Sequence, residues 1–255
     1  MILGILQARL SSTRLPGKVL ELIEGKPMLA CQIERLKRAR RMDAIVVATS
    51  DVPEDAAVAA LAMAEGVHAF QGSLDDVLER MAAAAAPFNP THVVRLTGDC
   101  PLADWEVIDQ CIDVCVAGDF DYCSNTLQPT WPDGIDVEVV RHDVLQTARR
   151  EATTIVEREH VTPFVNRRPE RFRLHNLASP VDLSTLRWTV DEPNDLAFIR
   201  RVYAALYPTK PAFNTADVLA LMHRHPDLAL INAGIERNKG LQRTIARWKE
   251  RSAHE

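Results

Sequence analysis

The sequence predicts an α/β fold with a mostly parallel sheet, helices on both of its faces, and a small α+β insertion. The first observation is an alternation of short apolar runs with amphipathic segments through residue 96, typical of β-α-β units. The second is a break in this rhythm near residue 119. The third is size, because 255 residues with 47% apolar content suffice for one large core. We expect one domain over 1–255, with the insertion at about 119–182 and a helical C-terminal tail at about 213–255.

In the first half of the chain, apolar runs predict strands at the N-terminus from Ile2 and at residues 43–49, 67–70 and 91–96. Buried parallel strands read as continuous apolar runs of this kind. Amphipathic or alanine-rich segments predict the connecting helices, at residues 28–41, 50–65 and 74–86. Such connections are expected to be right-handed crossovers.

In the second half, the sequence predicts shorter elements. The expected strands are residues 121–125, residues 135–139 and a strand that ends at Val190. Helices are expected at residues 105–117, 142–150, 155–167, from Glu192-Pro193 onward, 216–224, and in a basic segment that ends near Arg251. We assign no role to Asn238-Lys239-Gly240.

Composition excludes several classes of protein. The net charge is −5, which argues against a nucleic-acid partner, since such proteins carry a basic face. The chain shows no signal peptide and no apolar run long enough for membrane insertion. Its five cysteines are odd in number and lack a Cys-x-x-Cys pair. A cytoplasmic location is therefore expected.

A basic loop follows the first strand and carries Arg9, Arg14 and Lys18, with three hydroxyl side chains among them. Ligands of open α/β sheets bind outside the carboxyl ends of strands, and these cations suit a triphosphate. The loop is not a Walker A motif, because Ser12 and Val19 stand where that motif needs Gly and Ser or Thr. A solvated surface loop is the alternative interpretation.

Two aspartates stand just after predicted strands. Asp99 follows Gly98 at the end of the fourth strand, and Asp191 follows Val190. One or two protein carboxylates are what nucleotide-bound Mg²⁺ usually takes. Helix capping is the alternative role for both.

Further polar residues could line a sugar pocket. They are the carboxylates Asp133, Asp136 and Glu138, together with Arg158 and His160 on a predicted helix. Helix capping and a solvated strand edge are the alternatives. His160 could serve as a base, although the sequence places no nucleophile near it.

Four separated blocks resemble the cytidylyltransferase family, and most closely its spore-coat polysaccharide (SpsF-type) branch. They are Ala8-Arg9 with Ser12, Arg14-Leu15-Pro16 and Lys18; Arg95 through Leu102; 132–138 with 157–163; and Arg187 through Leu196. The Gly-Asp-x-Pro turn at Gly98 also resembles the branch that activates 3-deoxy-manno-octulosonate. The resemblance implies the Rossmann-like α/β sandwich of nucleotide-diphospho-sugar transferases, and a homodimer formed through the insertion.

The resemblance also implies a reaction, in which an acidic sugar attacks the α-phosphorus of CTP and pyrophosphate leaves. Arg14 and Lys18 would hold the β- and γ-phosphates, and Arg9 would lie near the α-phosphate or the base. Asp99 and Asp191 would hold Mg²⁺. The product would serve surface polysaccharide or glycoconjugate biosynthesis.

The resemblance further implies how the nucleotide base is read. Backbone groups near Gln7, Ala8 and Ser12 would contact the base edge, and Thr97 would join the nucleotide site. CTP over other triphosphates, and the identity of the acceptor sugar, stay open at this point.

Two other functions are compatible with the predicted fold. A glycosyltransferase that uses a nucleotide sugar would carry an Asp-x-Asp metal motif, and the match at Asp119-Phe120-Asp121 precedes a strand instead of following one. A non-catalytic nucleotide-binding module would be expected to lack a metal carboxylate or a loop cation, and all of these are present.

Overall fold

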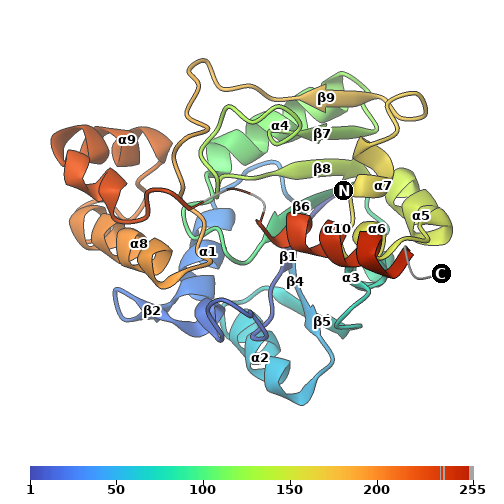
Figure 1. Cartoon of the computed structure of the whole chain (residues 1–255), viewed down its shortest axis with the longest axis horizontal. Helices are drawn as coiled ribbons and strands as arrows, with labels where there is room; N and C mark the ends of the chain where they lie inside the picture. The colour runs from blue at the N-terminus through green and yellow to red at the C-terminus, as the bar shows by residue number, and fades with distance from the viewer. Residues whose placement is uncertain (236, 238, 253–255) are drawn as a thin grey trace.

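The computed structural model describes residues 1–235, 237 and 239–252, and is built on a seven-stranded sheet in the order β5-β4-β1-β6-β8-β7-β9 (Figure 1). In chain order, the strands of this sheet are β1 (Ile2–Gln7), β4 (Ala44–Ser50), β5 (His68–Gly72), β6 (His92–Thr97), β7 (Tyr122–Ser124), β8 (Glu138–Arg141) and β9 (Leu174–Asn176). A two-stranded hairpin, β2 (Leu22–Ile23) and β3 (Lys26–Pro27), stands apart from it.

The first half of the sheet is parallel, as the sequence predicts. β1 pairs in parallel with β4 and β6, and β4 pairs in parallel with β5. The connecting helices are α1 (Met28–Leu36), α2 (Ala56–Ala64) and α3 (Val77–Ala85). The α/β class is therefore confirmed, with the helix boundaries differing by a few residues from those expected.

Beyond β6 the sheet becomes mixed. β8 runs antiparallel to both β6 and β7, whereas β9 is parallel to β7. The helices of this half are α4 (Trp105–Ala117), α5 (His142–Glu151), α6 (Ile155–His160), α7 (Pro163–Asn166), α8 (Pro193–Leu206), α9 (Thr215–Arg224) and α10 (Lys239–Ser252). Thus the residues at 119–182 supply three strands to the main sheet as well as α5, α6 and α7.

Two features of this half differ from the sequence prediction. The helix expected over 155–167 is broken into α6 and α7 at Val161, whose φ of 71° lies in the left-handed region and ends the first helix. The strand expected to end at Val190 is an extended segment that makes only an isolated parallel bridge, between Asp133 and Arg187. Its backbone bonds go instead to loop residues, such as Val190 N to Asp99 O at 2.8 Å.

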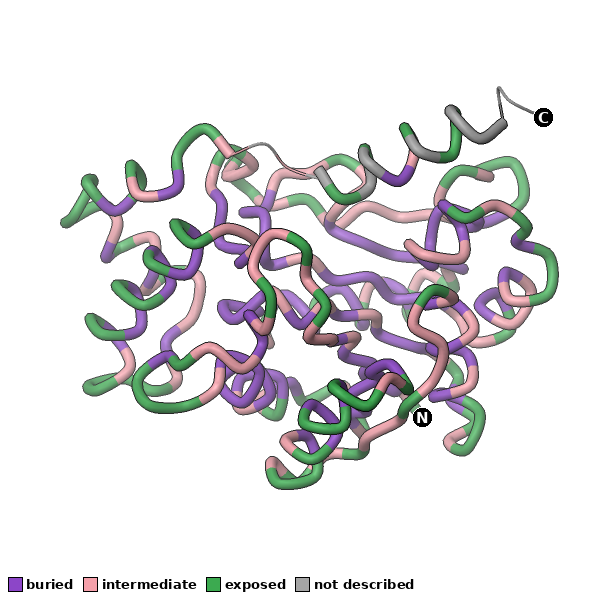
Figure 2. The backbone as a smooth tube through the Cα atoms, turned by 60° about the horizontal axis from the view of Figure 1, so that its bottom comes forward, coloured by how far each residue is buried: buried purple, intermediate pink, exposed green. Residues whose placement is uncertain are grey.

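Two hydrophobic layers sandwich the sheet, because alternate strand residues face opposite sides. Leu6, Val47 and Val94 pack on the layer formed with α1, α2, α4 and α8. Leu3 and Val46 pack on the layer formed with α3, α5 and α7. Figure 2 shows the buried residues concentrated in the sheet and on the inward sides of the helices.

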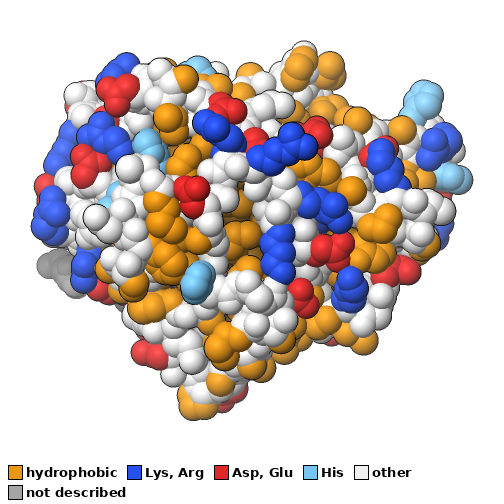
Figure 3. Space-filling view, turned by 180° about the vertical axis from the view of Figure 1, so that it is seen from behind, with side chains coloured by type: hydrophobic (Ala, Val, Ile, Leu, Met, Phe, Trp, Pro, Cys, Tyr) orange, Lys and Arg blue, Asp and Glu red, His pale blue; other side chains and the backbone are white. Residues whose placement is uncertain are grey.

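On the surface seen in Figure 3, basic and acidic side chains are interspersed with hydrophobic ones, and the basic side chains form no continuous patch. All five cysteines are buried and free. Among the described residues, no helix has both the length and the apolar character needed to cross a membrane.

Candidate active site

The carboxyl ends of β1 and β6 lie side by side and open onto a cavity of about 380 Å³. Gln7 pairs with Thr97, and both line this cavity. The chain continues into Gly98, where an added Cβ would lie 2.8 Å from the Cβ of Ala8 and 3.1 Å from the carbonyl oxygen of Gln7. Gly98 therefore allows the two strand ends to approach closely and directs Asp99 toward the cavity.

Lys18 lies buried between the two aspartates that the sequence predicts as metal ligands. Its ammonium donates to Asp99 Oδ2 at 3.1 Å and to Asp191 Oδ1 at 2.8 Å. A third bond goes to the carbonyl oxygen of Val190 at 2.7 Å. Two carboxylates from distant parts of the chain thus converge on one cationic group.

Lys18 and the aspartates of this cluster stabilise one another in their charged forms. Burial alone would lower the pKa of Lys18, but the carboxylates of Asp99 and Asp191 outweigh it and hold that pKa above its usual value. Burial would likewise raise the pKa of Asp99, but Lys18, with Thr97 and Cys100, lowers it to about 2. Asp99 is therefore ionised at neutral pH.

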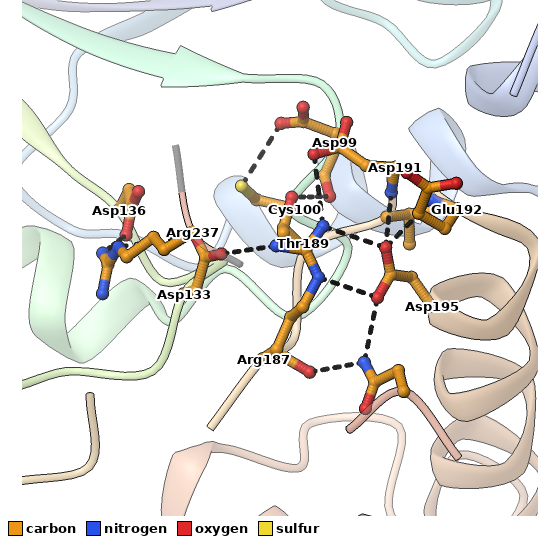
Figure 4. Close-up of polar contacts among 12 residues, drawn as sticks. Asp99, Cys100, Asp133, Asp136, Arg187, Thr189, Asp191, Glu192, Asp195 and Arg237 are labelled. Carbon is orange, nitrogen blue, oxygen red and sulfur yellow. Dashed lines mark hydrogen bonds and ion pairs between the residues drawn. The ribbon is translucent and has the colours of Figure 1, made fainter. Parts of the chain in front are cut away.

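Arginines fix the other oxygen of Asp191. Arg14 Nη2 lies 2.8 Å from Asp191 Oδ2, and Arg187 Nη2 lies 3.3 Å from the same oxygen. Arg187 also pairs with Asp195, through bonds of 2.9 and 3.0 Å, and with Asp133 Oδ2 at 2.7 Å. Figure 4 shows Arg187 between Asp133 on one side and Asp191 with Asp195 on the other. Arg187 thus links Asp133 to Asp191 and Asp195. Asp195 also accepts from the backbone N–H groups of Asp191 and Glu192 at 3.0 and 2.9 Å, which fixes the start of α8.

Asp133 reaches Arg187 because the two segments pack backbone to backbone. Trp188 N donates to Asp133 O at 2.6 Å, and Asp133 N donates to Leu186 O at 2.9 Å. Gly134 follows with φ of 111°, and an added Cβ would lie 2.4 Å from Thr189 N. Only glycine fits this approach without strain.

An acidic wall of the cavity is formed by Asp133 and Asp136 and is neutralised by Arg237 (Figure 4). Arg237 Nη2 donates to Asp136 Oδ1 at 2.7 Å, and Arg237 Nε lies 3.6 Å from Asp133 Oδ1. Burial raises the pKa of Asp136 to about 7 in spite of Arg237, with Asp133 and Glu138 adding to the effect. Burial also raises the pKa of Asp133.

Glu138 lines the cavity but its oxygens are fully engaged. Oε1 accepts from Tyr122 at 2.7 Å and from Thr162 at 2.8 Å, and Oε2 pairs with Arg95. Arg95 in turn donates to Gln7 Oε1 at 3.0 Å. The pKa of Arg95 is raised, because Glu138 outweighs the lowering effect of burial. Glu138 therefore orients the floor of the cavity through Arg95 and Gln7.

His160 lies at the cavity beside α10. Its Nε2 is 3.0 Å from the Thr244 hydroxyl, and burial lowers its pKa, so that the imidazole is neutral at pH 7.

Five residues predicted for the site do not line the cavity: Ala8, Arg9, Ser12, Lys18 and Arg158. Lys18 is buried behind it and touches two lining residues, Asp99 and Asp191. Ser12 Oγ accepts from Leu15 N at 3.3 Å and shapes the basic loop. Arg158 Nε donates to Asp76 Oδ2 at 2.8 Å, and its Nη1 donates to Arg149 O at 2.7 Å, so this arginine joins α6 to neighbouring helices.

Among the cavity residues that the sequence reasoning missed, four are arginines: Arg95, Arg167, Arg187 and Arg237. A signal existed for Arg95 and Arg187, since both belong to blocks that carry a predicted metal aspartate. No local pattern marks Arg237, which lies beside residues outside the described part of the chain, Asn238 among them.

The donor set at Asp99 and Asp191 fits a divalent cation. The two carboxylate oxygens share one cationic partner, and Mg²⁺ is typically held by one or two carboxylates with phosphate oxygens or water completing its shell. Within the described part of the chain, no group of three or more His, Cys, Asp or Glu side chains is arranged to hold a metal. An ion here would therefore need further oxygen ligands from water or from a bound substrate.

Comparison with known proteins gives one family for nearly the whole fold. The family model described as cytidylyltransferase matches residues 3–207. The spore coat polysaccharide biosynthesis protein SpsF of Bacillus subtilis is 32% identical over 237 residues, which are 89% of this chain and 96% of that protein. A cytidylyltransferase structure from Leptospira borgpetersenii superposes with a TM-score of 0.87 at 29% identity, covering 92% of this chain and 99% of the other.

A further relative matches over part of its length. The 3-deoxy-manno-octulosonate cytidylyltransferase of Anaeromyxobacter dehalogenans is 40% identical over 117 residues, or 45% of this chain and 47% of that enzyme.

Proposed function

The chain belongs to the cytidylyltransferase family, and we propose that it uses CTP to activate an acidic sugar as a CMP-sugar for polysaccharide or glycoconjugate assembly. The observation that carries this proposal is the convergence of Asp99 and Asp191 on Lys18, beside Arg14, at one wall of a cavity large enough for small substrates. Similarity to 3-deoxy-manno-octulosonate cytidylyltransferase supports the acidic acceptor, and similarity to SpsF supports the biosynthetic role.

The proposed reaction is a displacement at phosphorus. An acceptor hydroxyl oxygen forms a bond to the α-phosphorus of CTP, and the bond from that phosphorus to the bridging oxygen of the β-phosphate breaks. The hydroxyl proton is lost to solvent or to an acceptor group, and pyrophosphate leaves with the bond electrons. Such chemistry depends mostly on positioning and on neutralisation of charge.

In the proposal, residues of the basic loop neutralise the leaving pyrophosphate. Arg14 and Lys18 contact the β- and γ-phosphates, and Arg9 lies near the α-phosphate or the base. Arg14 is well placed to move between Asp191 and a phosphate, because its guanidinium is partly exposed. Lys18 would exchange its carboxylate contacts for phosphate oxygens as the site fills.

The base would be read at the ends of β1 and β6. Gln7 and Thr97 line the cavity there, while Ala8 and Ser12 offer backbone groups from the adjoining loop. The amide oxygen of Gln7 accepts from Arg95, which orients its NH₂ group for a pyrimidine edge.

Mg²⁺ is the proposed cofactor, held by Asp99 and Asp191, and when bound it would offset negative charge on the phosphates of CTP. Asp99 is kept ionised by its surroundings, as a metal ligand must be. Arg187 fixes the orientation of Asp191 through Oδ2 and leaves Oδ1 directed at the Lys18 ammonium.

For the acceptor, we propose contacts with Asp133, Asp136 and His160, with Glu138 fixing the floor of the site. All four line the cavity. Arg158 is left out of this set, because its guanidinium is bound to Asp76. The homodimer stays a prediction, which sedimentation would test.

The experiment is pyrophosphate release from CTP with Mg²⁺ and a panel of acidic sugars, with mass identification of the CMP-sugar. The panel contains 3-deoxy-manno-octulosonate and N-acetylneuraminate, and neutral mannose is the control. Release with an acid and none with mannose supports the proposal. Release without formation of a CMP-sugar, or no release with any acid, contradicts it.

A further inference from the structure

The C-terminal segment contributes to the cavity although it lies outside the region matched by the family model. That match ends at residue 207, whereas Arg237 and Gly240 line the cavity. α10 crosses the front of the molecule next to α6 (Figure 1). The residues that close this side of the cavity are therefore supplied by the tail.

Specific bonds hold the segment in place at both ends. Asn232 is buried, and its Nδ2 donates to Arg187 O at 2.9 Å and to Asp195 Oδ1 at 3.0 Å. At the other end, the Thr244 hydroxyl lies 3.0 Å from His160 Nε2 and donates to Glu159 Oε2 at 3.1 Å. Asn232 is thus bound to the cluster around Arg187 and Asp195, and Thr244 is bound to α6.

Between Asn232 and Thr244 in the sequence, Arg237 faces the acidic wall. Its partners are Asp136 at 2.7 Å, Asp133 at 3.6 Å and the carbonyl oxygen of Trp131 at 3.3 Å. A guanidinium has five N–H donors in a fixed fork, so donors remain for a ligand in the cavity. An aspartate pair without this cation would repel an anionic substrate.

Three of the four other cavity arginines have partners elsewhere in the site. Arg95 is engaged by Glu138 and Gln7, and Arg187 is engaged by three aspartates. Arg14 belongs to the phosphate side, where it pairs with Asp191. Among the residues that the structure describes, Arg237 is the one ion-pair partner of Asp136, whereas Asp133 pairs with both Arg187 and Arg237.

We propose that Arg237 determines specificity for an anionic acceptor, by neutralising Asp133 and Asp136 and by donating hydrogen bonds to the acceptor's carboxylate. The inference rests on the proposed function, since it names how that acceptor is recognised. It assigns Arg237 and Gly240 of the C-terminal part of the chain to the acceptor site. It predicts that loss of Arg237 affects the acceptor and spares the nucleotide.

The test compares KM values for the acceptor and for CTP, using whichever acid of the panel above the wild type turns over. Arg237→Ala should raise the acceptor KM at least ~10-fold, the scale of removing one partner of a close charge pair. The KM for CTP should stay within about two-fold, because that site lies with Arg14 and Lys18. Arg237→Lys, which keeps the charge and loses the fork, should fall between the two.

Two further variants separate recognition from folding. The double variant Arg237→Ala with Asp136→Asn removes the uncompensated charge, and it should recover part of the acceptor KM that Arg237→Ala loses. Lys249→Ala, at an exposed position of α10, is the matched control and should leave both KM values unchanged. Melting temperatures establish that each variant is folded before kinetics are compared.

The outcomes distinguish the two proposals. A selective rise in acceptor KM, partly reversed in the double variant, supports the role of Arg237. An unchanged acceptor KM, or equal rises for acceptor and CTP, overturns that role and leaves the proposed function standing. A wild type that converts none of the acids overturns the proposed function itself, and the inference falls with it.

Discussion

Replacing Lys18 with methionine tests whether this ammonium occupies a cation site between Asp99 and Asp191. Methionine keeps much of the side-chain volume and removes the charge that both carboxylates contact, at 3.1 and 2.8 Å. Asp191 would keep Arg14 and Arg187 as partners of its other oxygen. Asp99 would lose its one ion pair among the described residues, so the main cost falls there.

The magnitude follows from the pKa of Asp99. Its surroundings lower that pKa from 3.8 to about 2, and Lys18 is the largest of the favourable causes. At 1.36 kcal/mol per pKa unit, the shift corresponds to roughly 2 kcal/mol. Breaking a buried pair by removing one partner costs about 3–5 kcal/mol, and since Asp99 is partly exposed we expect about 2–4 kcal/mol.

The assay is thermal unfolding in metal-free buffer and with added Mg²⁺. For a chain of this size, each kcal/mol shifts the melting temperature by about 2–4 °C, so Lys18→Met should melt some 4–16 °C below wild type without metal. Mg²⁺ alone should then raise the melting temperature of the variant more than that of wild type, because the ion no longer competes with the ammonium.

Lys26→Met is the matched control. Lys26 pairs with Glu34 at 2.9 Å, but its side chain is 49% exposed, and such a pair is worth about 0–1 kcal/mol. Its loss should not create a response to Mg²⁺. The reasoning is refuted by a Lys18→Met protein that melts with wild type in metal-free buffer, or by one that Mg²⁺ stabilises no more than wild type.

Three further predictions concern other parts of the site. Asp99→Asn should remain folded and lower turnover by ~10²-fold or more, which is the scale of lost electrostatic stabilisation. As a control in the same pyrophosphate assay, Asp227→Asn, at an exposed position, should retain wild-type turnover. Gly134→Ala should destabilise the protein by more than the ~1–2 kcal/mol of a positive φ, and clearly more than Gly25→Ala in chemical unfolding. Both glycines have positive φ, but of the two only Gly134 lies within 3 Å of other backbone atoms. Equal costs would argue against that packing. Burial raises the pKa of Asp136 to about 7, so the folded state binds more protons than the unfolded state between about pH 4 and 7, and the contribution of Asp136 to stability falls as the pH rises through this window. The stability of Asp136→Asn relative to wild type should therefore increase from pH 5 to pH 8. A constant difference would contradict the raised pKa.

The parallel half of the fold could be predicted because its signals are local. Buried strands such as Ala44–Ser50 are continuous apolar runs, and the helices between them carry their own boundaries. For the same reason Asp99 and Asp191 could be proposed as partners, since each follows an extended apolar segment. Their convergence on Lys18 could be seen only in the structure. Asp99 lies 81 residues, and Asp191 lies 173 residues, from Lys18 in the sequence.

The cavity wall that carries Asp136 and Glu138 could not be predicted in the same way. Asp136 and Glu138 reach the carboxyl edge of the parallel strands because β8 runs antiparallel to β6, and that direction is set by long-range pairing. The breaking of the helix at Val161 depends on a left-handed backbone conformation that valine rarely adopts. Arg237 approaches Asp136 from a tail 101 residues away, and no local pattern in the sequence indicates that contact.

The most direct test of the account is calorimetric titration of CTP, with and without Mg²⁺, into wild type, Asp99→Asn and Asp191→Asn. UTP, GTP and ATP serve as the nucleotide controls. The account predicts that wild type binds CTP in preference to the other triphosphates, that Mg²⁺ strengthens this binding, and that either substitution abolishes the effect of Mg²⁺. Binding of CTP that is indifferent to Mg²⁺, or equally enhanced by it in the variants, would contradict the assignment of Asp99 and Asp191 as the metal-holding pair.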